Sequence, residues 1–315
     1  MDSLLCVLPS PLELDGWVEF NRMKWSLGAE RLCLTKSTSS LPCIEGVIYT
    51  DKRGRVVQPP RNPYLPMRFT STPTCSLPRL ERQWRSVSEL AIHEYGRRGM
   101  SGTISLQPGI YDLREWQWSG FPVSVKYTYV FRLPHAIESA DSAVRKQISK
   151  ANSAGFRCCR RADLADVVQC LADTERRQGF EYDITIDDLV LAGKLLGEDC
   201  LRVYGCYAPN GRVASARVVL LHPEGYAVDW LAGMKTDDLR SGATQLLFQF
   251  VLDDLSESGS RLFDHCGANL RSVSAAKATW GGQLISYYTV RQPNFRYVVS
   301  ALATVYRFRK GDCRP

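Results

Sequence analysis

One stretch decides the fold of this sequence: Phe263-Asp264-His265-Cys266-Gly267-Ala268-Asn269, followed eight residues later by Lys277 and then by Trp280-Gly281-Gly282. Its beginning predicts a buried strand, and Gly267 predicts a turn after that strand. A helix carrying Lys277 should follow, then a Gly-Gly stop and another strand over residues 284–290. A lysine beside the end of a core strand is a candidate for holding a phosphate or stabilising an oxyanion.

The residues before this stretch predict a regular α/β succession. Helical periodicity covers 164–178, 186–196 and 243–258, and Asn210-Gly211 predicts a hairpin turn between two strands. The expected strands span residues 201–208, 212–222, 226–231 and 261–265. This order predicts a mixed sheet with helices.

The first half of the chain predicts a rougher version of the same succession. Trp17, Phe20 and Trp25 indicate an early helix, and the further expected helices cover 82–98 and about 137–151 with a stop at Gly155. Strands are expected at 44–50, 55–58 after a turn at 51–54, 103–106 and 123–133, with a proline-rich extended loop at 59–66. We therefore predict two similar domains, 1–135 and 161–315, joined by a basic connecting helix, 136–160.

Composition limits the class of protein. The 315 residues carry a formal charge of +7 and include 30 arginines, 10 lysines, 11 cysteines and four histidines. Arginine excess favours an anionic substrate or RNA, but a GC-rich genome produces it too, so both interpretations stay open. No CxxC pair or metal-ligand spacing of histidines exists, so we expect no metal and mostly free thiols. No apolar run approaches the ~20 residues of a membrane span, and the N-terminus lacks the pattern of a signal peptide, so we expect a cytoplasmic protein.

A basic segment covers residues 142–162 and contains no acid. It carries six basic side chains: Arg145, Lys146, Lys150, Arg157, Arg160 and Arg161. A solvated helix face would explain it. A phosphate-binding edge would also explain it, because like charges this dense repel unless an anion compensates them.

Four segments stand in a recognisable order: Gln58-Pro59-Pro60 with Tyr64; Leu106 to Asp112 followed by Trp116 and Tyr127-Thr128-Tyr129; Arg145 to Ala151 with Gly155; and Phe263-Asp264 with Gly267 and Lys277 to Gly281. Together they resemble the tandem branch of the GNAT superfamily, the Fem family of aminoacyl-tRNA-dependent ligases and FemAB-like proteins. The resemblance implies two tandem GNAT-like domains. It also implies that strands 226–231 and 261–265 splay and leave backbone amides free for the acyl donor.

The expected CoA-binding loop departs from that pattern. Acetyl-CoA-using GNAT enzymes have a Q/R-x-x-G-x-G/A loop whose amides hold the pyrophosphate at a helix start, whereas residues 237–243 read DDLRSGA. The two carboxylates would repel a pyrophosphate, although a backbone nest could remain. No heptad run provides the coiled-coil arm of many Fem ligases. We expect no resident cofactor, with aminoacyl-tRNA or acyl-CoA as co-substrate.

The resemblance assigns the cations of the expected site. It implies that Lys277 binds a donor or acceptor phosphate or stabilises the developing negative charge; the other interpretation is a solvent-facing helix lysine. Arg145 would clamp an anionic acceptor, with Lys146 beside it. Gln58, Tyr64, Tyr127 and Asn269 are further candidates for substrate binding, although both tyrosines could equally be packing residues.

Three side chains on apolar strands are candidates for moving a proton. Asp264 either shuttles a proton with a raised pKa or makes a structural hydrogen bond to the Gly267 turn. Asp229 lies on the strand that would flank the acyl group and is a candidate base. His265 is another, although alternation points it away from Asp264 and a lone strand histidine is more often structural. No serine or cysteine has an evident base, with Cys266 beside His265 as the one exception, so no covalent acyl-enzyme is expected.

The sequence thus predicts an acyltransferase that moves an aminoacyl group from aminoacyl-tRNA, or an acyl group, to a small-molecule or peptide amine and forms an amide. The first alternative is an acyl-CoA-dependent N-acetyltransferase acting on a small metabolite or sugar amine. The second is a non-catalytic GNAT-like module that binds RNA or a protein.

Overall fold

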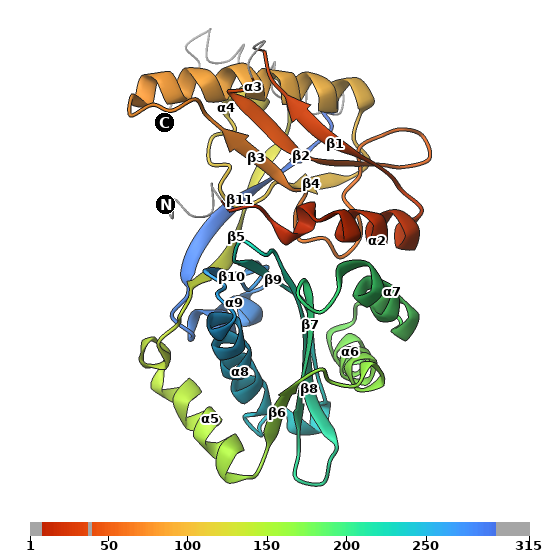
Figure 1. The fold of residues 1–315 in the computed structure, drawn as a ribbon, viewed down its shortest axis with the longest axis vertical. Coiled ribbons are helices and arrows are strands. Elements are labelled where there is room, and N and C mark those ends of the chain that lie inside the picture. The colour runs from red at the N-terminus through yellow and green to blue at the C-terminus, as the bar shows by residue number, and fades with distance from the viewer. Residues whose placement is uncertain (1–7, 37–39, 294–315) are drawn as a thin grey trace, which may run out of the picture. The chain divides into compact units, whose positions relative to one another are not determined.

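The computed structural model describes residues 8–36 and 40–293, which fall into two compact units (Figure 1). Unit 1 takes residues 126–286 together with 60–63 and the chain up to residue 26; unit 2 takes 27–59, 64–125 and the chain from residue 287. Strands β5 (Val123–Arg132) and β11 (Gln283–Arg291) each continue from one unit into the other. The units are therefore discontinuous in sequence, unlike the ranges 1–135, 136–160 and 161–315, which stay a prediction.

Unit 1 is built on a mixed sheet. Its strands lie in the order β5-β10-β9-β8-β7-β6. Among the described strands in this order, only the β9–β10 pair is parallel. It is short, joining just Leu262 to Tyr226, Phe263 to Ala227 and Asp264 to Val228. The bounds are β6 (Arg157–Arg160), β7 (Leu201–Tyr207), β8 (Val213–Leu221), β9 (Tyr226–Met234) and β10 (Leu262–Asp264).

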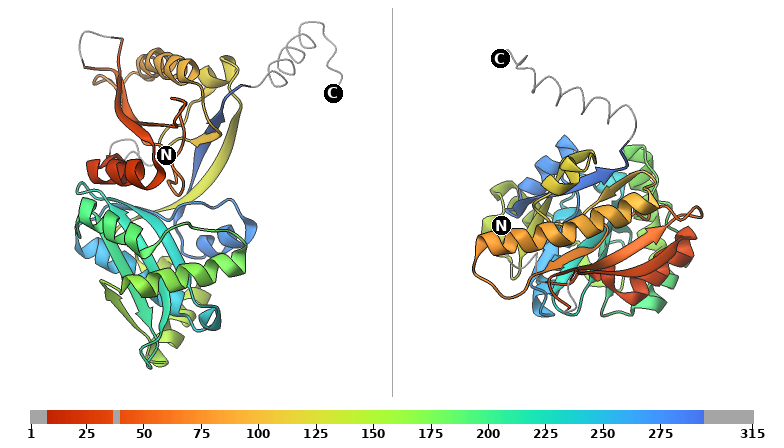
Figure 2. Two further views of the ribbon diagram at one scale, coloured as in Figure 1. Left: turned by 90° about the vertical axis from the view of Figure 1, so that its right-hand side faces the viewer. Right: turned by 90° about the horizontal axis from the view of Figure 1, so that it is seen from above.

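Helices cover both faces of this sheet. Figure 1 shows α6 (Leu164–Gln178) and α7 (Ile186–Leu196) on one side of the strands and α8 (Ala243–Glu257) on the other; α6 and α7 face the viewer in the left panel of Figure 2. Helix α5 (Ser142–Ser153), after a short turn η2 (Ile137–Ser139), packs on α8, and α9 (Arg271–Ala278) follows β10. Helix α2 (Asp15–Trp25), preceded by η1 (Pro11–Glu13), packs on α7. Phe131, Phe248 and Phe263 lie in the buried core on the α8 side.

The helix ends of unit 1 follow local signals. Asp163 caps α6 by accepting from the amide of Ala165 at 2.7 Å, and Gly179 ends the helix at φ 71°. Thr185 and Asp188 form a reciprocal capping box at the start of α7. Both helices therefore have the bounds predicted from the sequence.

Unit 2 contains an antiparallel three-stranded sheet in the order β1 (Gly28–Leu34), β2 (Cys43–Thr50) and β3 (Met67–Thr70). The long helix α3 (Leu77–Arg98) runs across these strands (Figure 2, right). Strand β4 (Thr103–Ser105) pairs with β11, and α4 (Arg114–Trp118) precedes β5. No helix in the described ranges is long and apolar enough to cross a bilayer.

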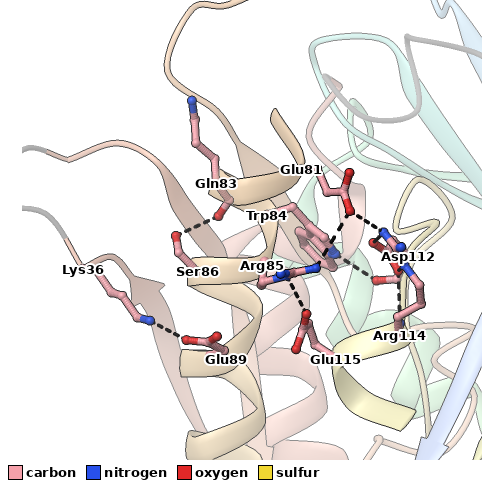
Figure 3. A network of polar contacts seen from close by, with 10 residues as sticks. All are labelled: Lys36, Glu81, Gln83, Trp84, Arg85, Ser86, Glu89, Asp112, Arg114 and Glu115. Carbon is pink, nitrogen blue, oxygen red and sulfur yellow. Dashed lines mark hydrogen bonds and ion pairs between the residues drawn. The ribbon is translucent and has the colours of Figure 1, made fainter. Parts of the chain in front are cut away.

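The exposed side of α3 carries a network of ion pairs (Figure 3). Arg114 contacts both Asp112 and Glu81, each at 2.9 Å, and Arg85 contacts Glu115 at 2.8 Å. Arg114 keeps 51% of its side-chain surface exposed, so water screens these pairs and they contribute little to the stability of unit 2.

The first half of the chain contains the errors of the sequence prediction. The turn at 51–54 is present, but the return strand at 55–58 was wrong: Val56 makes only isolated bridges to Thr50 and Met100. The partner of β2 is instead β1, which precedes it in the chain, and β1, β3 and β6 were not predicted. Helix α3 begins at Leu77, before the expected residue 82, because Pro78 is tolerated in a first turn.

Candidate active site

A cleft of about 470 Å³ opens in unit 1 between α5, α8 and α9. Its lining includes the side chains of Arg217, Phe248, His265, Lys277 and Trp280. Another pocket, of about 230 Å³, lies beside β6, β7 and α7, but its charged residues Arg161, Arg202 and Glu198 already form ion pairs. We therefore take the cleft lined by His265 and Lys277 as the candidate site.

A buried ion pair lies at the cleft between Arg217 on β8 and Asp229 on β9. Arg217 Nη1 donates to Asp229 Oδ2, and the two side chains are only 8% and 5% exposed. A bulge brings them together: Val218 pairs with Leu231 and Val219 with Asp229, so Trp230 is the extra residue. The guanidinium carbon also lies 4.7 Å from the ring centroid of Phe248.

His265 follows β10 directly and lies against the same pair. Its Nε2 is 3.5 Å from Asp229 Oδ2, longer than an ordinary hydrogen bond, and its ring stacks on Phe248 at 4.3 Å. Burial, together with the nearby cations Lys277 and Arg217, holds the pKa of the imidazole well below its ordinary value. His265 is therefore neutral near pH 7.

Lys277, on α9, reaches back to the turn that follows β10. Its Nζ donates to the main-chain carbonyl oxygens of His265 and Cys266. These carbonyls are presented because Cys266 and Gly267 both have positive φ, 45° and 65°. Burial lowers the pKa of the Lys277 ammonium. An ammonium has three N–H donors, so one remains for a group in the cleft.

Three buried polar atoms of this cluster have no hydrogen-bond partner within the part of the chain that the structure describes. They are Arg217 Nε, Asp229 Oδ1 and His265 Nδ1. A buried polar group left unpaired costs about 1–3 kcal/mol, so native proteins rarely gather several at one place without a functional reason. The cluster is thus the strongest candidate for chemistry in unit 1.

Asp264 is next to His265 but serves the turn. Its fully buried carboxylate accepts from Thr128 Oγ1 at 2.5 Å, from the amide of Cys266 at 2.8 Å and from Tyr226 Oη at 3.2 Å. These bonds hold the strand end that presents the two carbonyls to Lys277. Burial also raises the pKa of the Cys266 thiol well above its ordinary value, which disfavours a thiolate nucleophile.

The cations of the connecting segment lie outside the cleft lining. Arg145 is exposed, and its Nη1 donates to the carbonyl oxygens of Glu138 and Ala140 at 3.0 and 2.8 Å. Lys146 is also exposed, while Val144 and Gln147 of the same helix do line the cleft. The anion-clamp role of Arg145 stays a prediction.

The other substrate-binding candidates fall into two groups. Asn269 pairs with the main chain of Tyr127: its Oδ1 accepts from the amide at 2.9 Å and its Nδ2 donates to the carbonyl at 3.2 Å. Gln58 and Tyr64 belong to unit 2, where Gln58 accepts from the amide of Ser105 and Tyr64 packs edge-on against Tyr287. Their roles stay predictions.

The loop before α8 lies against α5. Gly242 has φ 86°, and a Cβ added to it would lie 2.1 Å from the carbonyl oxygen of Gln147. Lys150 Nζ donates to the carbonyl of Arg240 at 2.7 Å, and Asp238, in the turn η3 (Thr236–Asp238), pairs with Arg212. Helix α5 therefore packs closely on the start of α8.

Comparison with known proteins identifies the fold. No protein-family model matches the sequence, and no curated protein is significantly similar to it. FemX superposes with a TM-score of 0.62 at 12% identity, over 88% of this chain and 91% of its own. The chain has a tandem GNAT-like fold, which FemX shares.

Two further solved structures share this tandem GNAT-like fold. One is the C-terminal domain (DUF2156) of a protein described as a lysylphosphatidylglycerol synthetase from Agrobacterium fabrum, with a TM-score of 0.57 at 10% identity over 96% of this chain and 94% of that domain. The other is L-PGS from Bacillus licheniformis, with a TM-score of 0.54 at 12% identity over 90% and 93%. The predicted α/β class and the resemblance are confirmed.

Within this GNAT-like fold the sequence prediction missed Arg217. A signal for it existed, because Arg217 is the only charged residue in the fully buried strand Val213–Leu221. A charge in such a strand needs a partner, and Asp229 is the acid of the next strand. Among the described residues, no group of three or more His, Cys, Asp or Glu side chains is placed to hold a metal ion.

Proposed function

We propose that this protein transfers an aminoacyl group from aminoacyl-tRNA to an amine acceptor and forms an amide bond. The observation that carries the proposal is the cluster of Arg217, Asp229, His265 and Lys277 at one cleft of a fold shared with FemX. The solved structures named for an aminoacyl product, the lysylphosphatidylglycerol synthetases, support aminoacyl transfer as the class of reaction.

The chemistry assigns a role to each member of the cluster. The amine nitrogen attacks the ester carbonyl carbon, and the proton that it loses passes to His265, whose imidazole is neutral. Asp229 stabilises the resulting imidazolium from 3.5 Å. The remaining N–H of Lys277 stabilises the carbonyl oxygen as it becomes an oxyanion. The C–O bond then breaks, His265 returns its proton to the leaving ribose oxygen, and the amide remains.

Two further polar residues have supporting roles in this scheme. Asp264 is a positioning residue, because its hydrogen bonds orient the turn that Lys277 contacts. Arg217 holds Asp229 in place and adds positive charge beside the developing oxyanion. No covalent acyl-enzyme is needed in this scheme.

Helix α5 supports tRNA over CoA as the donor. A CoA pyrophosphate in GNAT enzymes lies on the amides at the start of the helix that corresponds to α8. Here the carbonyl of Gln147 lies against Gly242 at that start, and Asp238 precedes it. Meanwhile Lys146, Lys150 and Arg157, on α5 and β6, provide a basic surface for an RNA backbone.

The decisive experiment measures where the aminoacyl group goes. Aminoacyl-tRNA labelled in the amino acid is incubated with the protein and a panel of amines (an amino sugar, a lysine-containing peptide and ethanolamine), and the product is treated with mild alkali. The tRNA ester is cleaved by this treatment and an amide is not. We expect an alkali-stable labelled product that requires both the protein and an amine.

Two parallel measurements separate the alternatives. Thermal-shift titration with acetyl-CoA would show clear stabilisation below millimolar concentration if CoA is the donor, and this result without a tRNA-derived product would overturn the proposal. Ultraviolet absorbance before and after RNase treatment shows whether tRNA co-purifies. Co-purified RNA with no amide product under any condition would favour the non-catalytic module.

A further inference from the structure

The cleft presents positive charge to a molecule that enters it. Within the part of the chain that the structure describes, its charged or titratable lining side chains are Arg217, His265 and Lys277. Arg217 and Lys277 are cations, and the imidazole of His265 is neutral. We infer that the cleft takes its acceptor as an uncharged, weakly basic amine, like that of a peptide N-terminus or an amino sugar, and disfavours the alkylammonium of a lysine side chain. This inference rests on the proposed function, because it concerns the amine that attacks the aminoacyl ester.

Two carboxylates near the cluster do not line the cleft. Asp229 is 5% exposed and pairs with Arg217, and Asp264 is fully buried and accepts hydrogen bonds from the turn and from neighbouring strands. An ammonium in the cleft would therefore meet Arg217 and Lys277 and, among the described lining residues, no carboxylate. A cation taken out of water is stabilised only by an opposite charge or by hydrogen bonds, and a like charge nearby destabilises it further.

The rest of the lining is neutral. Gln147, Gln178 and Gln245 bring three carboxamides to the cleft from α5, α6 and α8. A carboxamide both donates and accepts hydrogen bonds, so it can bind the lone pair or an N–H of a free amine. Phe248 and Trp280 supply apolar surface to the same cleft. Partial desolvation by such a lining favours the neutral form of an amine over its ammonium.

The base at the cleft suits a weakly basic acceptor. Burial and the nearby cations hold the pKa of the His265 imidazole well below its ordinary value, so it is too weak a base to take a proton from a lysine ammonium, whose pKa is about 10.4. At pH 7 about one lysine side chain in 2,500 is a free amine, against about one peptide α-amine in seven. The free amine attacks the ester carbon, and the new C–N bond makes its N–H acidic enough for His265 to accept that proton.

The test compares acceptors that differ in the basicity of their amine. Glycyl-alanine amide offers only an α-amine, Nα-acetyl-lysine amide offers only a lysine side-chain amine, and glucosamine represents the amino sugars. Each is supplied at the same concentrations to the full chain with labelled aminoacyl-tRNA at pH 7, and alkali-stable amide is measured. We expect kcat/KM for the better of the two weakly basic amines to exceed that for the lysine derivative by at least about 100-fold, because the free-amine fractions of an α-amine and a lysine differ by about 350-fold.

A carboxylate placed in the cleft tests the cause of this preference. Gln147→Glu keeps the size of the side chain and adds a negative charge to the lining, so it should bind the lysine ammonium and reduce the preference to about tenfold or less. Asn152→Asp is the matched control, because Asn152 lies on the same helix α5, is exposed and does not line the cleft. Gln178→Glu, at an exposed residue of the lining, is the second variant if Gln147→Glu does not fold. The ratio of two acceptors is compared in each protein, so a general change of rate cancels.

Each outcome decides a different statement. A rate with the lysine derivative equal to or above that with both weakly basic amines would overturn the inference and leave the proposed function intact. An equal preference in the wild type and in both lining variants would show that the charge of the cleft does not select the acceptor, and would overturn the inference as well. The absence of any amide product with all three acceptors and with ethanolamine would overturn the proposed function and the inference with it.

Discussion

The buried pair Arg217–Asp229 gives the sharpest test of the site. Its side chains are 8% and 5% exposed, so removing one partner leaves an uncompensated charge in the protein interior. In Asp229→Val the guanidinium loses its carboxylate, and in Arg217→Met the carboxylate loses its cation. Breaking a buried pair in this way costs about 3–5 kcal/mol, and we expect each single variant to lose that much free energy of unfolding.

The double variant separates stability from function. Replacing both partners removes both desolvation costs, so Arg217→Met/Asp229→Val should be within about 1–2 kcal/mol of the wild type, or more stable. Aminoacyl transfer should nevertheless be lost, because His265 no longer has a carboxylate beside it. Stability restored without activity would show that the pair is kept for the reaction.

Urea denaturation followed by circular dichroism gives the free energies, and the alkali-stable amide assay gives the rates. Glu198→Gln is the matched control, because the Arg161–Glu198 pair is 74% and 62% exposed and should contribute less than about 1 kcal/mol. The reasoning fails if Asp229→Val costs no more than this control. It also fails for function if the double variant transfers aminoacyl groups at the wild-type rate.

Three further outcomes are expected. Lys277→Met should lower the rate of aminoacyl transfer about 100-fold or more, as loss of an oxyanion donor does, and leave the circular dichroism spectrum unchanged. A wild-type rate in the amide assay would contradict the role of Lys277 as an oxyanion donor. Burial lowers the pKa of His265 from 6.5 in the folded protein, so below about pH 6.5 the unfolded chain binds a proton that the folded chain does not. The free energy of unfolding should therefore fall as the pH drops below about 6.5, by at most about 1.4 kcal/mol per pH unit. His265→Gln should lack this component, and equal pH slopes of the urea midpoint in the two proteins would refute a neutral buried imidazole. Gly242→Ala should lower the free energy of unfolding more than Gly259→Ala does. Both glycines have positive φ, but only a Cβ at residue 242 would clash, with the carbonyl of Gln147. Equal urea midpoints of the two variants would show that α5 does not pack on the start of α8.

Much of unit 1 could be predicted because its signals are local. Helices α6 and α7 have the predicted bounds, since Asp163, Gly179 and Thr185 lie where capping needs them. The hairpin of β7 and β8 follows from Asn210-Gly211 and two apolar runs. Strands β1, β3 and β6 escaped prediction because a strand is stabilised by its partner strands and by burial more than by its own residues. Strand β2 pairs with β1 and β3, and not with the segment after the turn at 51–54.

The candidate site also combines residues that the sequence singled out with contacts that only the structure shows. Lys277 could be singled out from the sequence, since the carbonyls that it contacts are those of the turn directly before its own helix. Asp264 could be singled out but not interpreted, because Thr128 and Tyr226, which bind its carboxylate, lie on other strands. Its hydrogen bonds connect it to the turn, and its role as a proton shuttle stays a prediction.

The sequence by itself therefore determined the order of most elements from α6 onward, the GNAT-like class and the lysine that follows the Phe263–Asn269 stretch. Only the tertiary structure decided that Arg217, Asp229 and His265 meet. They lie on or directly after three different strands, and the bulge at Trp230 sets which side chains face each other across β8 and β9. Such a register is fixed by pairing and burial over the whole sheet, and no spacing within one segment records it.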